Sequence, residues 1–216
     1  MNEQLQATLI EAMGSDKSVV NAARVSFGVT REGELNERDE RLIKFLAREK
    51  HVTPFRHPTI SFRCKAPIAI ARQLGKHQGG FSWNEMSRRY KDGAVELFIP
   101  KEIFERPSDL HAGAGNPLTT GAQNSALVLI NRAYETALES YDELIKFIAP
   151  EQARFVLPQG MITEWVWTGS LYGWSELCRQ RLSDHAQYEV RLFASTIDEE
   201  LRKLFPISWD ALRENH

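Results

Sequence analysis

Polar and apolar residues repeat with helical spacing in two stretches near the start of the chain. Ser15 and Asp16 suit the cap of a short helix that runs through Ala23, because their side chains accept hydrogen bonds from free amide groups. Residues 36–39 start a second helix. Its apolar positions are Leu42, Ile43, Phe45 and Leu46. Both segments are predicted to be amphipathic helices.

Strict alternation replaces this spacing at residues 58–65. The apolar face holds Ile60, Phe62 and Cys64, and the polar face holds Ser61, Arg63 and Lys65. Alternation with a period of two predicts a strand that buries one face. Pro67 suits the first turn of a following helix, and residues 96–100 predict another short strand.

The second half of the chain is mostly helical by the same criterion. Residues 106–121 are rich in Pro, Gly, Ser and Ala without periodicity, which predicts a surface loop. Helical spacing then continues through residues 119–148, the longest predicted helix. Residues 161–168 predict a strand, and residues 170–181 and 184–204 predict two further helices.

Composition narrows the class of protein. The chain has 216 residues, 42% of them hydrophobic, without internal repeats or low-complexity linkers, so one α/β or α+β domain is expected. Its 27 basic and 29 acidic residues disfavour nucleic acid or a membrane surface as main partner. Cys64 and Cys178 lack metal-ligand spacing and are expected to be reduced core thiols of a cytoplasmic protein. Neither a signal peptide nor a membrane span is expected.

Residues 71–90 concentrate chemically active side chains. A basic cluster consists of Lys76, His77, Arg88 and Arg89. Interleaved with it are Glu85, the rings of Trp83 and Tyr90, and the glycine pair 79–80. Arginine and lysine suit phosphate oxygens, and aromatic faces beside cations stack flat ligands. The stretch therefore suits an anionic aromatic ligand, with a solvated charged face as the alternative.

Two further clusters are candidates for binding. The C-terminal third carries Arg154, Arg179, Arg181, His185 and Gln187. Arg181 and His185 share a face if one continuous helix contains both, although such residues also cap helices or pair with surface carboxylates. No third ligand accompanies His185 and Glu189, so no metal site is predicted. The turn-rich residues 51–57 add two imidazoles that can bind a ring ligand or cap a helix end.

These segments, in this order, resemble the flavin-dependent thymidylate synthases over residues 15–212. The motifs that carry the resemblance are Ala23-Arg24-Val25-Ser26, His51-Val52-Thr53-Pro54-Phe55, Ala71-Arg72-Gln73 with Ser87-Arg88-Arg89-Tyr90, Ala153-Arg154-Phe155-Val156-Leu157-Pro158, and Arg181-Leu182-Ser183-Asp184-His185-Ala186-Gln187-Tyr188-Glu189. The family signature begins Arg-His-Arg, whereas this chain has Lys76-His77-Gln78 and one extra residue before Ser87. Gly79 and Gly80 are expected to let backbone N–H groups approach phosphate or flavin instead.

The resemblance implies an α+β fold, in which a small, mostly antiparallel sheet is flanked by helices that include a long one, as a single domain over residues 1–216. It implies a dUMP site formed by Gln73, Leu74, Gly75, Lys76, Glu85, Met86, Ser87, Arg88, Arg89, Arg154 and Arg181. It also implies an FAD site formed by Thr53, Lys76, His77, Gln78, Glu85, His51 and His185, with Ser170, Tyr172 and Glu176 at positions where the family carries other residues.

The chemistry of uracil points to Arg181 as the catalytic residue. C5 of uracil is a poor nucleophile, and loss of the N3 proton pushes electron density towards it. A guanidinium beside N3 stabilises that anion as it forms. Neither cysteine has the electropositive setting of a reactive thiolate. Ser87 lacks a base triad, which favours phosphate binding over nucleophilic attack.

The expected activity is the methylation of dUMP to dTMP. Methylenetetrahydrofolate would donate the carbon, and FAD reduced by NADPH would donate the hydride, in a homotetramer whose sites are shared between subunits. One alternative is a non-catalytic nucleotide- or flavin-binding paralogue of the same fold. A module that binds RNA or single strands is disfavoured by the charge balance.

Overall fold

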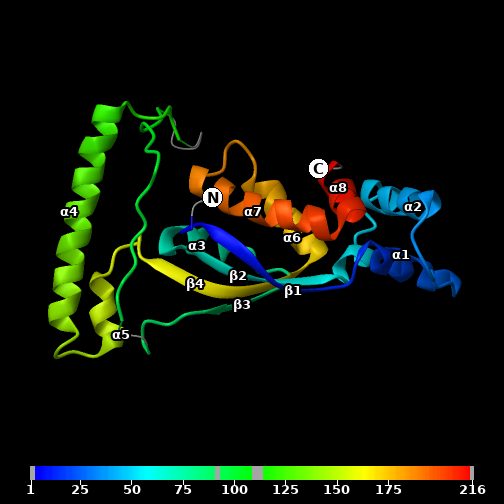
Figure 1. Cartoon of the computed structure of the whole chain (residues 1–216), viewed down its shortest axis with the longest axis horizontal. Coiled ribbons are helices and arrows are strands. Elements are labelled where there is room, and N and C mark those ends of the chain that lie inside the picture. Colours follow the sequence, from blue (N-terminus) through cyan, green and yellow to red (C-terminus); the bar gives the residue numbers. More distant parts are fainter. Residues whose placement is uncertain (1–2, 91–92, 109–113, 215–216) are drawn as a thin grey trace.

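Four antiparallel strands form the centre of the molecule (Figure 1). The computed structural model describes residues 3–90, 93–108 and 114–214. The strands lie in the order β1-β2-β4-β3. Their bounds are β1 (Gln6–Met13), β2 (Thr59–Pro67), β3 (Phe81–Glu85) and β4 (Ile162–Ser170). The fold is therefore α+β with a small antiparallel sheet, as expected.

The two central strands carry the alternation that the sequence shows. Ile60, Phe62 and Cys64 of β2 are fully buried, and Phe62 lies opposite Trp167 of β4. Trp165 and Trp167 of β4 are buried on the same side of the sheet. Side chains two residues apart share a face, so large apolar groups from both strands gather on one side and build the core there.

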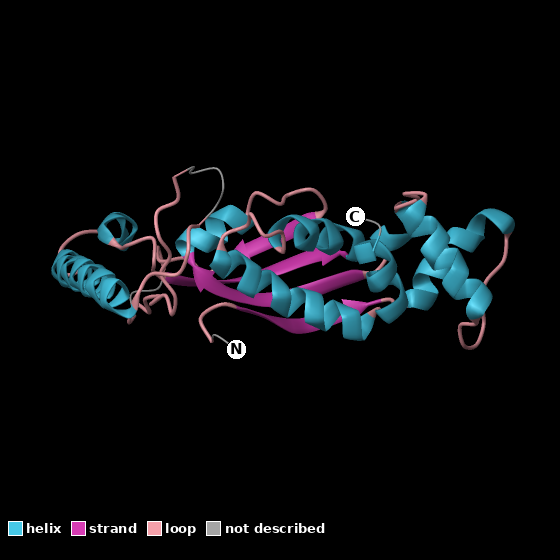
Figure 2. Cartoon of the chain, turned by 90° about the horizontal axis from the view of Figure 1, so that it is seen from above, coloured by secondary structure: helices cyan, strands magenta, loops and turns pink. Residues whose placement is uncertain are grey.

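Helices cover that side of the sheet. Figure 2 shows them from above, over the strands. The helices that pack on the sheet are α3 (Ile68–Leu74), α6 (Leu171–Arg181) and α7 (Tyr188–Leu204). At one end, α1 (Asp16–Arg24), α2 (Glu37–Arg48) and α8 (Pro206–Glu214) pack against one another. No helix in the described part of the chain combines the length and apolar composition that a membrane crossing requires.

The longest helix stands away from the sheet. Figure 1 shows α4 (Thr120–Leu144) at the far end of the molecule, beside the short helix α5 (Pro150–Ala153). Of its 25 residues only Tyr141 is buried. Val128 and Leu129 are more than half exposed. The apolar side chains that predicted this helix are therefore mostly not covered by other parts of the described chain.

Several local predictions were wrong. Residues 96–100 form no strand, since Leu97 makes only an isolated bridge to Met161. The helix expected at residue 184 begins at Tyr188, so α6 and α7 are separate and Arg181 and His185 do not share a continuous helix. Phe45 on α2 is 43% exposed rather than part of the buried face. The strands β1 and β3 and the helix α8 were not predicted. Residues 109–113 of the predicted loop lie outside the described part.

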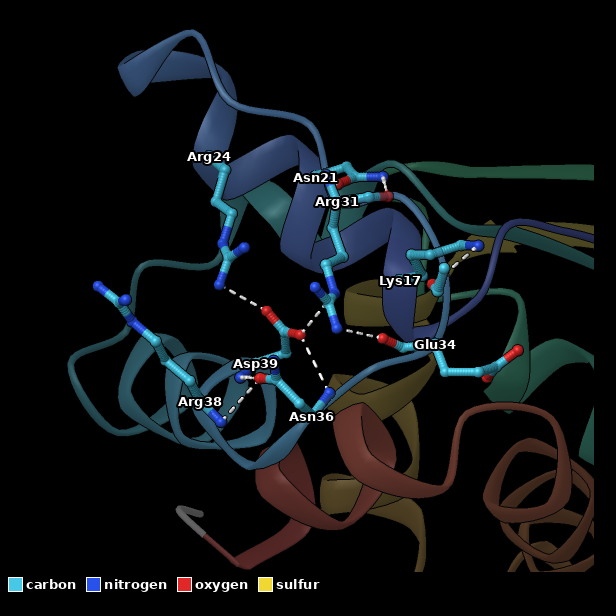
Figure 3. A network of polar contacts seen from close by, with 9 residues as sticks. Lys17, Asn21, Arg24, Arg31, Glu34, Asn36, Arg38 and Asp39 are labelled. Carbon is cyan, nitrogen blue, oxygen red and sulfur yellow. Dashed lines mark hydrogen bonds and ion pairs between the residues drawn. The ribbon is translucent and has the colours of Figure 1, made fainter.

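A buried carboxylate ties α1 to α2 (Figure 3). The Asp39 side chain is fully buried and pairs with Arg24 at 2.5 Å and with Arg31 at 3.0 Å. It also accepts a hydrogen bond from the backbone N–H of Asn36, whose own side chain caps α2 by accepting from the backbone N–H groups of Arg38 and Asp39. A carboxylate with two guanidinium partners is stabilised by charge-assisted hydrogen bonding, so Asp39 holds α2 to the end of α1 and to the loop that joins the two helices.

We expect Asp39→Asn to lower the free energy of unfolding by about 1.5–3 kcal/mol, because the charge that both arginines share is lost while the shape is kept. Glu37→Gln is the matched control: Glu37 lies on the same helix, but its side chain is 89% exposed in its pair with Arg41, so its effect should stay within about 0.5 kcal/mol. Urea denaturation measures both values. Equal effects of the two substitutions would contradict the role assigned to Asp39.

Candidate functional site

One stripe of α3 and one face of β3 enclose the largest part of the site, which we call the α3 cavity. Ile68, Ala71, Arg72 and Gly75 follow the i, i+3, i+4, i+7 spacing that places side chains on one side of a helix. Phe81, Trp83 and Glu85 alternate on β3 and therefore face the same way. Lys76, His77, Gln78 and Trp167 complete the lining. The volume of the cavity is about 540 Å³.

Aromatic rings form the wall of the α3 cavity on the side of the sheet. Trp83 stacks on Trp165 with ring centroids 4.4 Å apart and meets Trp167 edge to face at 5.1 Å. A Cβ atom at Gly169 would come within 2.3 Å of the Phe81 ring, so only glycine lets β3 and β4 approach this closely. The buried Nε1–H of Trp167 has no hydrogen-bond partner in the described structure. This nitrogen has almost no accessible surface, so neighbouring side chains enclose it and it is not open to the cavity.

A second space, the Arg154 cavity, adjoins the first. It has a volume of about 290 Å³ and shares Ile68 and Glu85 with the α3 cavity. Its other lining residues are Met86, Arg88, Arg154, Phe155, Leu157, Gln159, Met161 and Thr163. Glu85 is fixed at the junction: its Oε1 accepts from Thr163 at 2.7 Å and its Oε2 accepts from the Trp83 indole at 3.2 Å.

Arg88 gives the Arg154 cavity a buried positive charge. Its side chain donates to the backbone carbonyls of Gly93 at 2.7 Å and Ala94 at 2.8 Å. The residue is only 6% exposed, and no ion pair to a carboxylate is present in the described part of the chain. Because a buried charge without a counter-charge is costly, this guanidinium favours an anionic ligand in the cavity.

A third space, the Arg56 cavity, adjoins the α3 cavity on its opposite side. It has a volume of about 410 Å³ and shares His77 and Phe81 with the α3 cavity. Its other lining residues are Arg56, Gly79, Gly80, Ser170, Tyr172, Gly173 and Glu176. Gly80 has a φ of +77°, a conformation that glycine adopts without strain. The three cavities are therefore connected in one row through shared residues.

A hydrogen bond joins His77 to Arg181 across 104 residues of sequence. The Nε–H of Arg181 donates to Nε2 of His77 at 2.8 Å. Burial, and after it the charge of Arg181, lower the pKa of His77 from 6.5 to about 4. The imidazole is therefore neutral near pH 7 and carries its proton on Nδ1. No hydrogen bond from the η nitrogens of Arg181 is present in the described structure, so they are available to a ligand.

The structure brings most of the predicted site residues to these three cavities. Those that line them are Gly75, Lys76, His77, Gln78, Glu85, Met86, Arg88, Arg154, Ser170, Tyr172 and Glu176. Those that do not are Thr53, His51, Gln73, Leu74, Ser87, Arg89, Arg181 and His185. Leu74 is fully buried in the core, and His185 is exposed. Arg181 reaches the α3 cavity only through His77.

Other lining residues were not selected from the sequence. They include Arg56, Phe81, Thr163 and Trp167. The alternation of Phe81, Trp83 and Glu85 was the available signal for a strand, but the dense polar residues around it favoured a loop. Arg56 lies within the turn-rich residues 51–57, whose histidines were considered in its place.

The two cysteines lie outside this region of the molecule. Cys64 and Cys178 are free and buried. Burial raises the pKa of both thiols above the ordinary value. A thiol with a raised pKa carries little thiolate near pH 7, so neither side chain is suited to nucleophilic attack.

Sequence comparison identifies relatives along nearly the whole chain. The family described as thymidylate synthase complementing protein matches residues 8–207. The flavin-dependent thymidylate synthase of Ehrlichia ruminantium (strain Gardel) is 36% identical over 209 residues, which cover 95% of this chain and 69% of the relative. That of Thermus thermophilus is 35% identical and covers 96% and 75%, respectively. That of Pseudothermotoga lettingae is 33% identical and covers 94% and 87%.

Structural comparison identifies a similar fold. The UMP/dUMP methylase PolB from Streptomyces cacaoi, bound to 5-Br dUMP, superposes with a TM-score of 0.86 at 28% identity. The alignment covers 97% of this chain and 94% of that protein. The complex of PolB with 5-Br UMP gives a TM-score of 0.85 at 27% identity.

The depressed pKa of His77 predicts a pH-dependent stability. As pH falls from 6.5 towards about 4, the unfolded chain binds a proton at His77 before the folded chain does. His77 therefore lowers the free energy of unfolding as pH falls through that window, and it has no such effect above the window. His77→Gln keeps an acceptor for Arg181 but cannot titrate, so it should lose less stability than wild type between about pH 7 and about pH 5.

Urea midpoints at the two pH values measure this difference. Substitution of the exposed His57 by Gln is the control and should keep the wild-type profile. A His77→Gln protein whose stability falls with pH as steeply as that of wild type would show that His77 is not held neutral by burial and Arg181.

Proposed function

The chain belongs to the family of flavin-dependent thymidylate synthases, and we propose that it methylates dUMP to dTMP with FAD as its bound cofactor. The observation that carries this proposal is the row of three connected cavities. Glu85 lines both the Arg154 cavity and the α3 cavity, and His77 lines both the α3 cavity and the Arg56 cavity. Such an arrangement suits a nucleotide and a dinucleotide cofactor that meet at their reactive rings.

The α3 cavity fits the flavin ring. Trp83 offers an aromatic wall on which a flat ring can stack. Lys76 and Gln78 lie on the turn that closes the cavity. Bound there, FAD reduced by NADPH would supply the hydride that completes the methyl group.

The Arg154 cavity fits dUMP. Arg88 and Arg154 supply positive charge, and charged donors hold phosphate more strongly than neutral ones. Ser87 and Arg89 flank Arg88 in the sequence, and the Nε–H of Arg89 donates to Oγ of Ser87 at 3.3 Å. The pair presents a hydroxyl and a guanidinium together, which supports the phosphate role expected of both residues. Glu85 then lies between the nucleotide and the flavin.

Arg181 is the residue to which we assign catalysis. With Nε held by His77, its η nitrogens form a paired donor edge. Such an edge matches the planar imide of uracil and stabilises the anion that forms when N3 loses its proton. Because His77 is neutral, Arg181 supplies the positive charge of this pair. Electron density at C5 then increases. C5 would bond to the methylene carbon of methylenetetrahydrofolate as a bond from that carbon to a folate nitrogen breaks, and C5 would release its proton.

We assign the active form to a homotetramer. The helix α4 buries one residue of 25, Val128 and Leu129 on it are more than half exposed, and Phe147 just after its end is 75% exposed. Apolar side chains gathered on one element favour contact with another chain. A second copy would cover this helix, and in the assembly Arg181, which lies outside the three cavities of its own chain, would reach the uracil bound at a neighbouring copy's site. The proposed compartment is the cytoplasm, where free thiols such as Cys64 stay reduced.

UMP is a second candidate substrate. The structurally similar PolB acts on both UMP and dUMP, as its name states. The two nucleotides differ only in the 2′-hydroxyl, so the same cavity chemistry can hold either.

The activity is tested by flavin reduction and by tritium release. Protein purified with FAD should be yellow, and NADPH should bleach the flavin absorbance. In the presence of methylenetetrahydrofolate, [5-³H]dUMP should release tritium as C5 is methylated. Parallel reactions with [5-³H]UMP measure the preference between substrates. A protein that binds FAD and dUMP but releases no tritium from either nucleotide would be the non-catalytic paralogue instead.

Arg181→Ala should lower kcat by about 100-fold or more, because the donors aimed at the developing anion are removed. FAD should remain bound. Arg48→Ala is the control, since Arg48 is an exposed residue of α2 paired with Glu49, and it should leave turnover unchanged. Single-turnover measurement of tritium release compares the variants. Normal turnover by Arg181→Ala would refute the catalytic assignment.

A further inference from the structure

The geometry points to Arg56 as the cation that holds the diphosphate of FAD, with the Arg56 cavity as the diphosphate subsite. This inference rests on the proposed function. A flavin dinucleotide is longer than its ring system, so a ring in the α3 cavity must continue into a neighbouring space. The Arg154 cavity is assigned to the nucleotide. The Arg56 cavity, which shares His77 and Phe81 with the α3 cavity, is the other adjoining space.

Arg56 is held in place without an acidic partner. It ends the short helix η2 (Thr53–Arg56), which the fully buried Phe55 ties to the core. The Arg56 guanidinium lies over the Tyr172 ring at 5.4 Å. No ion pair of Arg56 with a carboxylate is present in the described structure. A planar guanidinium whose face rests on an aromatic ring keeps its N–H edge for an oxyanion.

The other residues of the cavity allow an anion to enter. His77 is held neutral by burial and by Arg181, which keep its pKa at about 4. The carboxylate of Glu176 is paired with Arg179 at 2.8 Å, which offsets its charge. A Cβ atom added at Gly79 or Gly80 would meet nothing within 4 Å. The backbone of this turn is therefore open, and a phosphate can approach it closely.

Binding of three flavins of different length distinguishes the diphosphate subsite from the site of the flavin ring. Riboflavin carries no phosphate, FMN carries one and FAD carries the diphosphate. Arg56→Ala should weaken FAD binding by about tenfold or more, since one charge-assisted hydrogen-bond donor is lost. Riboflavin binding should be unchanged, and Arg56→Lys should lie between wild type and Arg56→Ala because it keeps the charge without the planar fork. Arg41→Ala, an exposed cation of α2, is the control.

Titrations that follow flavin fluorescence measure all three ligands, and unchanged riboflavin affinity also shows that each variant is folded. Equal FAD affinity of Arg56→Ala and wild type would overturn the assignment. An equal loss of riboflavin and FAD affinity would overturn it as well, because Arg56 would then act on the ring site. In both cases a wild type that binds FAD leaves the proposed function standing. A wild type that binds no FAD would refute the proposed function itself, and this inference with it.

Discussion

The pairing of β3 with β4 is the interaction on which the functional region depends. Five residues of β3 lie opposite residues 165–169 of β4, and this register directs Phe81, Trp83 and Glu85 towards α3. Gly169 permits it, because any side chain there would collide with Phe81. Without this pairing the α3 cavity would lose one wall, Glu85 would lose its contact with Thr163, and the turn at residues 76–80 would not be closed. A five-residue edge strand therefore organises all three cavities.

Shared residues connect the cavities chemically as well as spatially. Glu85 is fixed by Thr163 and Trp83 where the Arg154 cavity and the α3 cavity meet. His77 lies where the α3 cavity and the Arg56 cavity meet, and it also orients Arg181. A second residue holds each of these two side chains in one rotamer. A site whose side chains are fixed in this way before the ligand binds is preorganised. Binding in one cavity can therefore influence the next one through a single side chain.

Local signals explain which parts of the structure could be predicted from the sequence. The helix start at Asn36 and the alternation around Phe62 depend on neighbouring residues only, and both predictions were confirmed. β3 owes its strand conformation to β4, some 80 residues later, and was missed. The family resemblance named eleven residues that line the cavities. It placed Glu85 in both the dUMP site and the FAD site, but it did not indicate that His77 is shared by two cavities, or that Arg56 and Trp167 line them, because these relations arise only when three distant segments pack together.

The central claim is that flavin and nucleotide occupy adjoining cavities with Glu85 between them. A crystal structure of the protein with FAD and dUMP bound tests it most directly. We expect the flavin ring against Trp83 in the α3 cavity and the uracil ring beside it, close enough for reaction at about 3–3.5 Å. We expect the phosphate of dUMP in the Arg154 cavity. A nucleotide bound away from Glu85, or a flavin outside the α3 cavity, would contradict this claim.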